Sequence, residues 1–200
     1  MKKLIFTSLH LYIFTLIFAG DALAQYTKRV DTFPYGFVQL GAGTTTTFEN
    51  GGVYAPNVAL GIGAGISKDI SARLSISGFT QQVKMASGTE HFNYFDVNAD
   101  VLFNVINIFK AHYHGRFNPA IIAGVGYNNG WEYEKIDQDY DVFNGVNLHG
   151  GLLLDYILSD QWNIGLEGTV AMLDDDFNAL RGKHNKDGML NLRATLTFKF

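Results

Sequence analysis

The C-terminal segment, residues 189–200, constrains the fold of this chain more than any other part of the sequence. It reads M-L-N-L-R-A-T-L-T-F-K-F, so apolar and polar side chains alternate. Because successive side chains of a β-strand point to opposite faces, this alternation predicts a strand with one apolar face and one polar face. A soluble sandwich rarely ends on an exposed run of Leu and Phe. A strand of a membrane barrel has lipid on one side and a polar lumen on the other, and this segment fits that environment.

The same alternation recurs along the chain and predicts an all-β fold, an eight-stranded antiparallel up-and-down transmembrane barrel. The expected strands are residues 35–45, 54–66, 70–83, 91–103, 119–127, 142–157, 162–173 and 189–200. Most contain the roughly ten residues that a tilted spanning strand needs. Tight turns at residues 67–69 and 159–161 alternate with long loops, as expected for a barrel with short periplasmic turns and longer external loops.

The N-terminus has the pattern of a cleavable signal peptide. Lys2 and Lys3 precede an apolar stretch, and Ala22-Leu23-Ala24 supplies a small-x-small cleavage site. The apolar stretch is shorter than a spanning helix requires. We therefore expect residues 1–24 to be a signal peptide and residues 25–200 to form one outer-membrane barrel domain.

Composition excludes several other classes of protein. The chain has no cysteine, which rules out disulfides, thiolate metal sites and a lipid-modified N-terminal cysteine. Its net charge of −4 and the lack of basic clusters argue against nucleic-acid binding.

Two internal stretches carry a family resemblance. Residues 119–127 (P-A-I-I-A-G-V-G-Y) and 158–167 (L-S-D-Q-W-N-I-G-L-E) resemble recurring strand and turn pieces of the small OmpA-type and OmpX-type eight-stranded barrels of bacterial outer membranes. The terminal Phe198 and Phe200 match the pattern that the barrel-assembly machinery of that family recognises. The resemblance implies a Gram-negative outer-membrane location, with outer-membrane lipid and lipopolysaccharide as neighbours.

Charged residues on the inward faces are the first candidate site. Hairpin register places Arg73 near Asp100 and Glu167 near Arg193. An eight-stranded barrel has an interior just wide enough for side chains, and buried charges need partners. These four residues are predicted to be lumen ion pairs that plug the barrel. A narrow ion pore is the alternative.

An enzyme of the same outline is a second alternative. Some eight-stranded outer-membrane barrels modify lipid A by acyl transfer or deacylation, and the lumen-facing strands here carry His149 together with Ser71, Ser75 and Ser77. A nucleophile needs its base within hydrogen-bond reach, and no motif ties one of these serines to the histidine. We assign no catalytic residue.

Two further patterns contain residue types that bind metal ions. His112-x-His114 lacks a third ligand. Asp137, Asp139 and Asp141 resemble the start of a calcium loop, but Val142 and Leu148 stand where that loop needs Gly and Glu. No metal site or cofactor is predicted.

The external loops are the remaining candidate. Residues 128–141 carry Trp131, Tyr133 and Tyr140 among acidic side chains, and exposed aromatic residues are frequent contact makers. We expect a structural or surface-interaction role, with these three residues as contact candidates for an unidentified surface partner. A soluble lipocalin-like barrel would require the opposite arrangement, with an apolar interior and a polar exterior.

Overall fold

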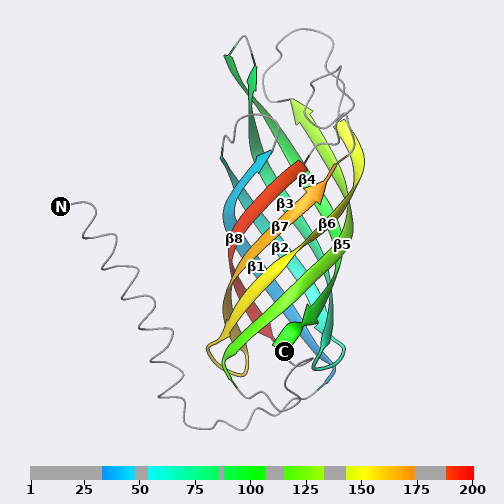
Figure 1. The fold of residues 1–200 in the computed structure, drawn as a ribbon, viewed down its shortest axis with the longest axis vertical. Coiled ribbons are helices and arrows are strands. Elements are labelled where there is room, and N and C mark those ends of the chain that lie inside the picture. The colour runs from blue at the N-terminus through cyan, green and yellow to red at the C-terminus, as the bar shows by residue number, and fades with distance from the viewer. Residues whose placement is uncertain (1–32, 48–53, 86–87, 107–114, 133–142, 174–187) are drawn as a thin grey trace, which may run out of the picture.

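The computed structural model describes residues 33–47, 54–85, 88–106, 115–132, 143–173 and 188–200. Their eight strands are β1 (Tyr35–Thr47), β2 (Ala55–Gly65), β3 (Ile70–Met85), β4 (Gly88–Asn104), β5 (Phe117–Glu132), β6 (Phe143–Ile157), β7 (Trp162–Met172) and β8 (Gly188–Lys199). Each strand pairs antiparallel with its sequence neighbours, and β8 pairs with β1, so the sheet closes into a barrel (Figure 1). The predicted eight-stranded antiparallel barrel is confirmed. Within the described ranges, no helix is long and apolar enough to cross a membrane.

Tight turns connect β2 to β3 and β6 to β7 at one end of the barrel, which we call the turn end. Ser67 Oγ accepts hydrogen bonds from the backbone N–H groups of Asp69 and Ile70, at 3.2 and 3.1 Å. Ser159 Oγ accepts one from the N–H of Trp162 at 3.1 Å. Serine can bond its own backbone in this way and so supports short turns. We call the opposite end the loop end.

The two ends of the barrel sequence meet at the turn end. The backbones of Gly36 and Phe200 exchange two hydrogen bonds of 2.9 Å, next to the rungs that join β1 to β8. The Phe200 ring lies over Gly36, since a Cβ there would lie 2.5 Å from a ring carbon. The rings of Trp162 and Phe198 pack 4.8 Å apart between their centroids. Phe198 and Phe200 therefore belong to an aromatic group at this rim.

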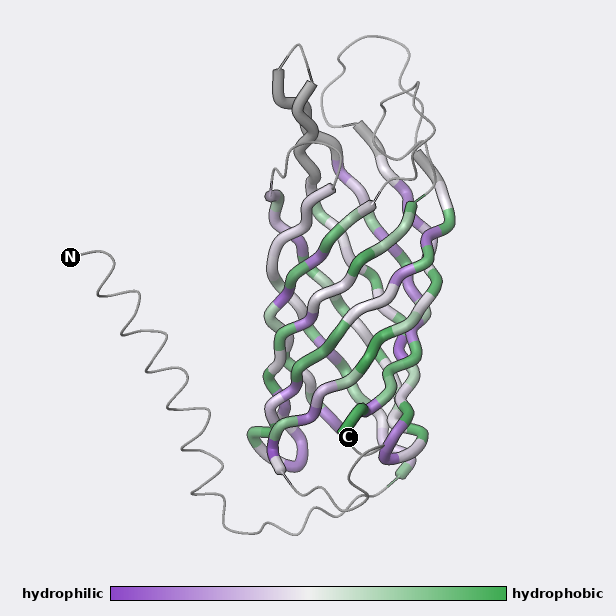
Figure 2. Tube along the Cα trace, in the orientation of Figure 1, coloured by the Kyte–Doolittle hydropathy of each residue, from purple (hydrophilic) through white to green (hydrophobic). Residues whose placement is uncertain are grey.

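Apolar side chains cover the outside of the barrel and polar ones fill much of the inside. Leu166 is 63% exposed, while Glu167 beside it on β7 is 3% exposed and its rung partner Arg193 is 7% exposed. Figure 2 shows hydrophobic and hydrophilic residues alternating along the strands. A soluble barrel would place these groups the other way round, because exposed leucines favour hydrocarbon over water. The described strands therefore have the arrangement of a membrane barrel.

The interior also contains two apolar clusters that the strand pattern did not single out. One consists of Leu102, Ala120, Ile122 and Leu153. The other consists of Tyr94, Ala171, Leu173 and Met189. The interior of the barrel therefore has a polar part and two apolar parts. One apolar part lies on β4, β5 and β6, and the other on β4, β7 and β8.

Strands β3 to β6 are longer than the other four and extend past them at the loop end (Figure 1). In the part of the chain that the structure describes, β3 pairs with β2 no further than Phe79, yet it pairs with β4 as far as Met85↔Gly88. Among the described residues, β6 pairs with β7 no further than Leu148, yet it pairs with β5 as far as Phe143. We call this extension the projecting sheet and define it as residues 80–85, 88–93, 126–132 and 143–147.

Three expected boundaries were wrong at this extension. The strand expected to end at residue 83 continues to Met85, and the next begins at Gly88 instead of residue 91. Residues 128–132, expected in a loop, belong to β5, so Trp131 lies in a strand. Polar residues in this region suggested loops, but backbone pairing with a neighbouring strand outweighs such local preferences.

Gly78 lies at the base of the projecting sheet. Its φ of 149° is a conformation that residues with a Cβ rarely adopt. A Cβ at this position would also lie 2.2 Å from the carbonyl oxygen of Tyr94 on β4. Only glycine allows β3 to pass β4 in this way where β3 leaves the barrel.

Candidate functional site

The four charged residues singled out from the sequence lie together in the lumen as one connected chain. Arg73 Nε donates to Asp100 Oδ2 at 2.7 Å, and Arg73 Nη1 donates to Glu167 Oε2 at 2.5 Å. Arg193 Nη1 donates to the other oxygen of Glu167, Oε1, at 3.0 Å. All four side chains are almost completely buried. Glu167 therefore joins two ion pairs, Arg73–Asp100 and Glu167–Arg193, into a single network that we call the lumen cluster.

Register explains half of this arrangement. Arg73 and Asp100 are direct partners on β3 and β4, and Glu167 and Arg193 are direct partners on β7 and β8. The contact between Arg73 and Glu167 crosses the lumen between strands that do not pair. It forms because two long inward side chains meet in an interior that is only wide enough for side chains.

Neutral polar side chains accept further hydrogen bonds from the two arginines. Arg193 Nε donates to Asn57 Oδ1 at 2.5 Å, and its Nη2 donates to Ser77 Oγ at 3.2 Å. Arg73 Nη1 also donates to Gln39 Oε1, whose amide Nε2 donates to Thr197 Oγ1 at 3.0 Å. These contacts matter because a buried ion pair is favourable only when its other donors are also bonded.

A histidine and two asparagines extend the cluster along β5 and β6. His149 Nε2 lies 2.5 Å from Asp100 Oδ1, and His149 Nδ1 lies 2.7 Å from Asn147 Oδ1. The amide Nδ2 of Asn147 donates to Asn128 Oδ1 at 2.6 Å. The histidine is thus held by a carboxylate and an amide within the same network.

The serines weighed for catalysis do not meet this histidine. Ser77 Oγ donates to Asp96 Oδ2 at 3.3 Å and accepts from Arg193. Both ring nitrogens of His149 are already in contact with Asp100 and Asn147. A Ser–His dyad of the kind that acyl transfer requires is not formed by these residues.

Lumen-facing glycines provide the space for the charged side chains. A Cβ at Gly61 would lie 3.2 Å from Arg73 Cδ. A Cβ at Gly124 would lie 2.4 Å from Asp100 Oδ1 and 2.5 Å from His149 Nε2. A side chain at Gly124 would therefore occupy the place of the His149–Asp100 contact. This accounts for the glycine-rich inward faces in the sequence.

The lumen cluster leaves little free space in the barrel. A cavity of about 20 Å³ lies against Arg73, Glu167 and Arg193, and a second cavity of about 60 Å³ lies on the turn side of the cluster. One water needs at least about 10–15 Å³ of such space, so the smaller cavity has room for one water and the larger for a few. Among the described residues, the lumen is filled by side chains.

The structure describes only some of the loop aromatic residues and candidate metal ligands that were named from the sequence. Trp131 belongs to β5, whereas Tyr133 and Tyr140 lie outside the described residues, as do His112, His114 and the three candidate aspartates. Within the described ranges no group of three or more His, Asp or Glu side chains is arranged to hold a metal ion. Sequence reasoning did not anticipate Gln39, Asn57 and Asn147, because inward polar residues carry no signal of which strand they will reach across the lumen.

Comparisons with known proteins support the fold and not a particular activity. No family model and no curated protein sequence matches the chain. Solved structures of bacterial outer-membrane proteins do match, and the likeness shows that this chain shares their small eight-stranded β-barrel fold. The chain is similar to Neisserial surface protein A, with 10% identity and a TM-score of 0.58 over 84% of this chain and 97% of that one.

Two further structures give the same result. A major outer membrane protein of Thermus thermophilus has 14% identity and a TM-score of 0.58 over 84% of this chain and 100% of that one. Ail, the attachment invasion locus protein of Yersinia pestis, has 12% identity and a TM-score of 0.55 over 84% and 99%. The Ail structure was solved in complex with the heparin analogue sucrose octasulfate. Identities this low establish the fold alone.

Proposed function

We propose that this protein is an integral outer-membrane barrel that makes surface contacts through its loop end, with a lumen closed by the lumen cluster. Residues 1–24 would act as a signal peptide that directs the chain out of the cytoplasm. The turn end would face the periplasm and the loop end the outside of the cell, as in other barrels of this kind. Outer-membrane lipid and lipopolysaccharide would surround the barrel. The assembly machinery would recognise the terminal strand with Phe198 and Phe200.

The projecting sheet is the observation that carries this proposal. Beyond its last rung with β2 at Phe79, β3 continues its ladder with β4 as far as Met85 among the described residues. At about 3.4 Å per residue, that amounts to roughly 20 Å of strand beyond the last rung with β2. A membrane anchor alone does not need such an extension. It fits a barrel that presents a surface for contact.

Open edges give the projecting sheet a way to bind. Strand edges offer unpaired N–H and C=O groups that can pair with an added strand. Among the described residues, the part of β3 beyond Thr80 forms ladder pairs only with β4, and the outer part of β6 forms them only with β5. The same sheet includes Trp131, the one of the three aromatic contact candidates that lies in a described strand. Tyr133 and Tyr140 remain candidates for the same contact surface.

The closed lumen argues for a contact role over a pore. Two buried arginines are held by two buried carboxylates across the lumen. Opening a path would separate buried ion pairs, and breaking one such pair costs about 3–5 kcal/mol. In planar bilayers, the purified wild-type protein should therefore give no large, steady channels. Such channels would overturn the closed-lumen part of the proposal.

A shortened variant tests the contact role. Residues 81–92 are replaced by Asn-Gly, a pair suited to a two-residue hairpin turn, which preserves the pairing of Thr80 with Asn93. Bacteria that display either form are compared for retention on a heparin-coated surface and on a layer of bacteria of the same strain. Heparin is chosen because the Ail structure holds a heparin analogue. Heat-modifiable gel mobility verifies that both forms fold.

The wild-type chain should retain more cells than the shortened chain on at least one of the two surfaces. Equal retention on both surfaces, with both forms folded and equally displayed, would contradict the contact role of the projecting sheet. The conductance result is independent of this outcome, so the two parts of the proposal can fail separately.

A further inference from the structure

Three buried oxygen atoms near the turn end have no hydrogen-bond partner within the described part of the chain. They are Asp155 Oδ1 on β6, Asn163 Oδ1 on β7 and Thr195 Oγ1 on β8. The three residues are 6%, 2% and 6% exposed. Buried polar groups are normally bonded, so three orphaned oxygens on adjacent strands call for an explanation.

Gly165 explains how two of these oxygens come together. It is the rung partner of Asp155 on one side and of Thr195 on the other. The position that a Cβ would take at Gly165 lies 2.4 Å from Asp155 Oδ1 and 2.7 Å from Thr195 Oγ1. Both oxygens therefore lie close to the position that a Cβ would take at Gly165. They can be no further apart than the sum of those distances, and they are not hydrogen-bonded to each other.

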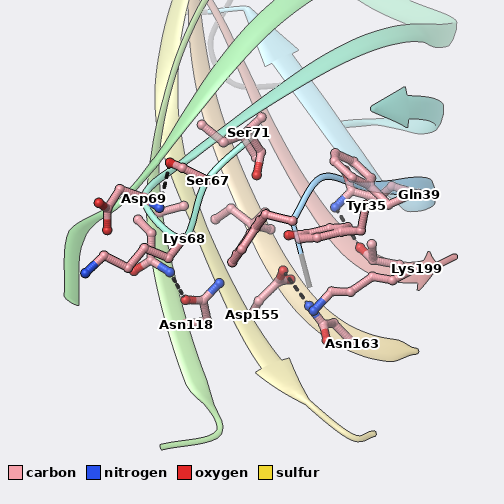
Figure 3. Close-up of a pocket in the computed structure, with 17 residues that line it drawn as sticks. Tyr35, Gln39, Ser67, Lys68, Asp69, Ser71, Asn118, Asp155, Asn163 and Lys199 are labelled. Carbon is pink, nitrogen blue, oxygen red and sulfur yellow. Dashed lines mark hydrogen bonds between the residues drawn. The ribbon is translucent and has the colours of Figure 1, made fainter. Parts of the chain in front are cut away.

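Asn163 completes this oxygen cradle, which we define as Asp155, Asn163 and Thr195. Its amide Nδ2 donates to Asp155 Oδ2 at 3.2 Å, which leaves Asp155 Oδ1 and its own Oδ1 as acceptors. Figure 3 shows Asp155 and Asn163 joined by this bond, with Lys199 from β8 in the same view. Both residues also line the cavity of about 60 Å³ on the turn side of the lumen cluster. An ion could therefore reach the cradle from that cavity.

Charge favours a cation at this place. The buried lumen residues include four carboxylates, Asp96, Asp100, Asp155 and Glu167, but only two guanidinium groups. Those two, on Arg73 and Arg193, form their ion pairs with Asp100 and Glu167. Lys199 attracts the Asp155 carboxylate electrostatically but is itself partly exposed at the rim. Asp96 and Asp155 are thus the two buried carboxylates that neither arginine bonds among the described residues, and Asp155 is the one that lines the cavity on the turn side.

We propose that the oxygen cradle binds one small monovalent cation of the size of Na⁺. Hard cations take oxygen ligands from carboxylate, amide and hydroxyl groups, which are the three groups present here. A single carboxylate matches a single positive charge. Oxygen ligands of such ions lie at about 2.3–2.6 Å from the metal, the value known for Ca²⁺, so one ion between Asp155 Oδ1 and Thr195 Oγ1 fits the upper limit on their separation. This inference does not depend on the contact role proposed above.

The test uses the full mature barrel in detergent, with NaCl exchanged for choline chloride at constant ionic strength. Choline is too large for the cradle. A ligand that binds only the folded state raises its stability as the ligand concentration rises. The thermal midpoint of barrel unfolding should therefore increase with Na⁺ and level off at saturation. A midpoint that is the same in both salts would mean that the cradle binds water only, and would overturn the proposal.

Three variants locate the effect. Asp155→Asn keeps the shape but removes the charge, and should abolish the difference between the two salts. Thr195→Val should weaken it, which provides a second readout if the first variant folds poorly. Asp160→Asn, in the exposed turn at the same end, removes one acidic charge away from the cradle and should behave as wild type. A full Na⁺ effect in Asp155→Asn would contradict the assignment. So would its loss in Asp160→Asn.

Crystals soaked in a thallium(I) salt give a direct view, because Tl⁺ replaces small monovalent cations and has a strong anomalous signal. The peak should lie between Asp155, Asn163 and Thr195. A crystal without a peak in the lumen, or with a peak only elsewhere, would contradict the site.

Discussion

Replacing Glu167 by glutamine should destabilise the barrel more than any other single isosteric change in the lumen cluster. Within the described part of the chain, Glu167 is the only carboxylate that bonds both arginines, at 2.5 Å to Arg73 and 3.0 Å to Arg193. In Glu167→Gln, Arg73 keeps the Asp100 carboxylate, but Arg193 loses its bonded carboxylate and is left with neutral partners such as Asn57 and Ser77. Removing one partner of a buried pair costs about 3–5 kcal/mol. Because Arg73 stays paired, we expect a loss of about 3 kcal/mol.

The assay is equilibrium unfolding by urea in lipid vesicles or detergent, followed by β-sheet circular dichroism and by heat-modifiable gel mobility. Asp160→Asn is the matched control, since it also replaces an acid by its amide but in an exposed turn, where changes usually stay within about 0.5 kcal/mol. A double variant, Glu167→Gln with Arg193→Met, should recover part of the loss, because it removes the unpaired cation as well. A cost below about 1 kcal/mol for Glu167→Gln, equal to the control, would show that water solvates the arginines and that the lumen is open.

Three further changes probe other parts of the fold. Gly124→Ala should cost about 1–3 kcal/mol, because its Cβ would overlap the contact of Asp100 with His149, and the same unfolding assay measures it. Leu166→Arg places a charge on the lipid face and should cost about 2–4 kcal/mol near the bilayer midplane; an effect near zero would place that face in water. Gly78→Ala should cost about 1–3 kcal/mol through backbone strain and contact with the neighbouring strand, and wild-type protease resistance of the projecting sheet in this variant would count against its role at the base.

Much of the barrel could be predicted because side-chain alternation is a local property. Leu192 is apolar and faces lipid, whereas Arg193 is charged and faces the lumen. The chemistry of these two side chains therefore predicts their difference in burial. Counting residues back from each hairpin placed Arg73 opposite Asp100 and Glu167 opposite Arg193, and the register agrees. Such counting works when the strands pair without a bulge.

The remaining features depend on contacts that a sequence does not encode locally. The bond from Arg73 to Glu167 joins strands on different sides of the lumen, so no hairpin count predicts it. The continuation of β5 through Trp131 follows from pairing with β4, although the local sequence is polar and rich in asparagine and glycine. The oxygen cradle is likewise invisible, because Asp155 and Thr195 lie on strands separated by β7.

The orientation of the side chains is the claim on which the whole account rests, and site-directed spin labelling along β8 tests it most directly. The chain has no cysteine, so single cysteines can be introduced without background. In lipid vesicles, labels at Leu192, Ala194 and Leu196 should collide readily with dissolved oxygen, which concentrates in hydrocarbon, while labels at Asn191 and Thr195 should not. An oxygen accessibility that alternates with this phase supports the barrel described here. The opposite phase, or no alternation, would contradict it.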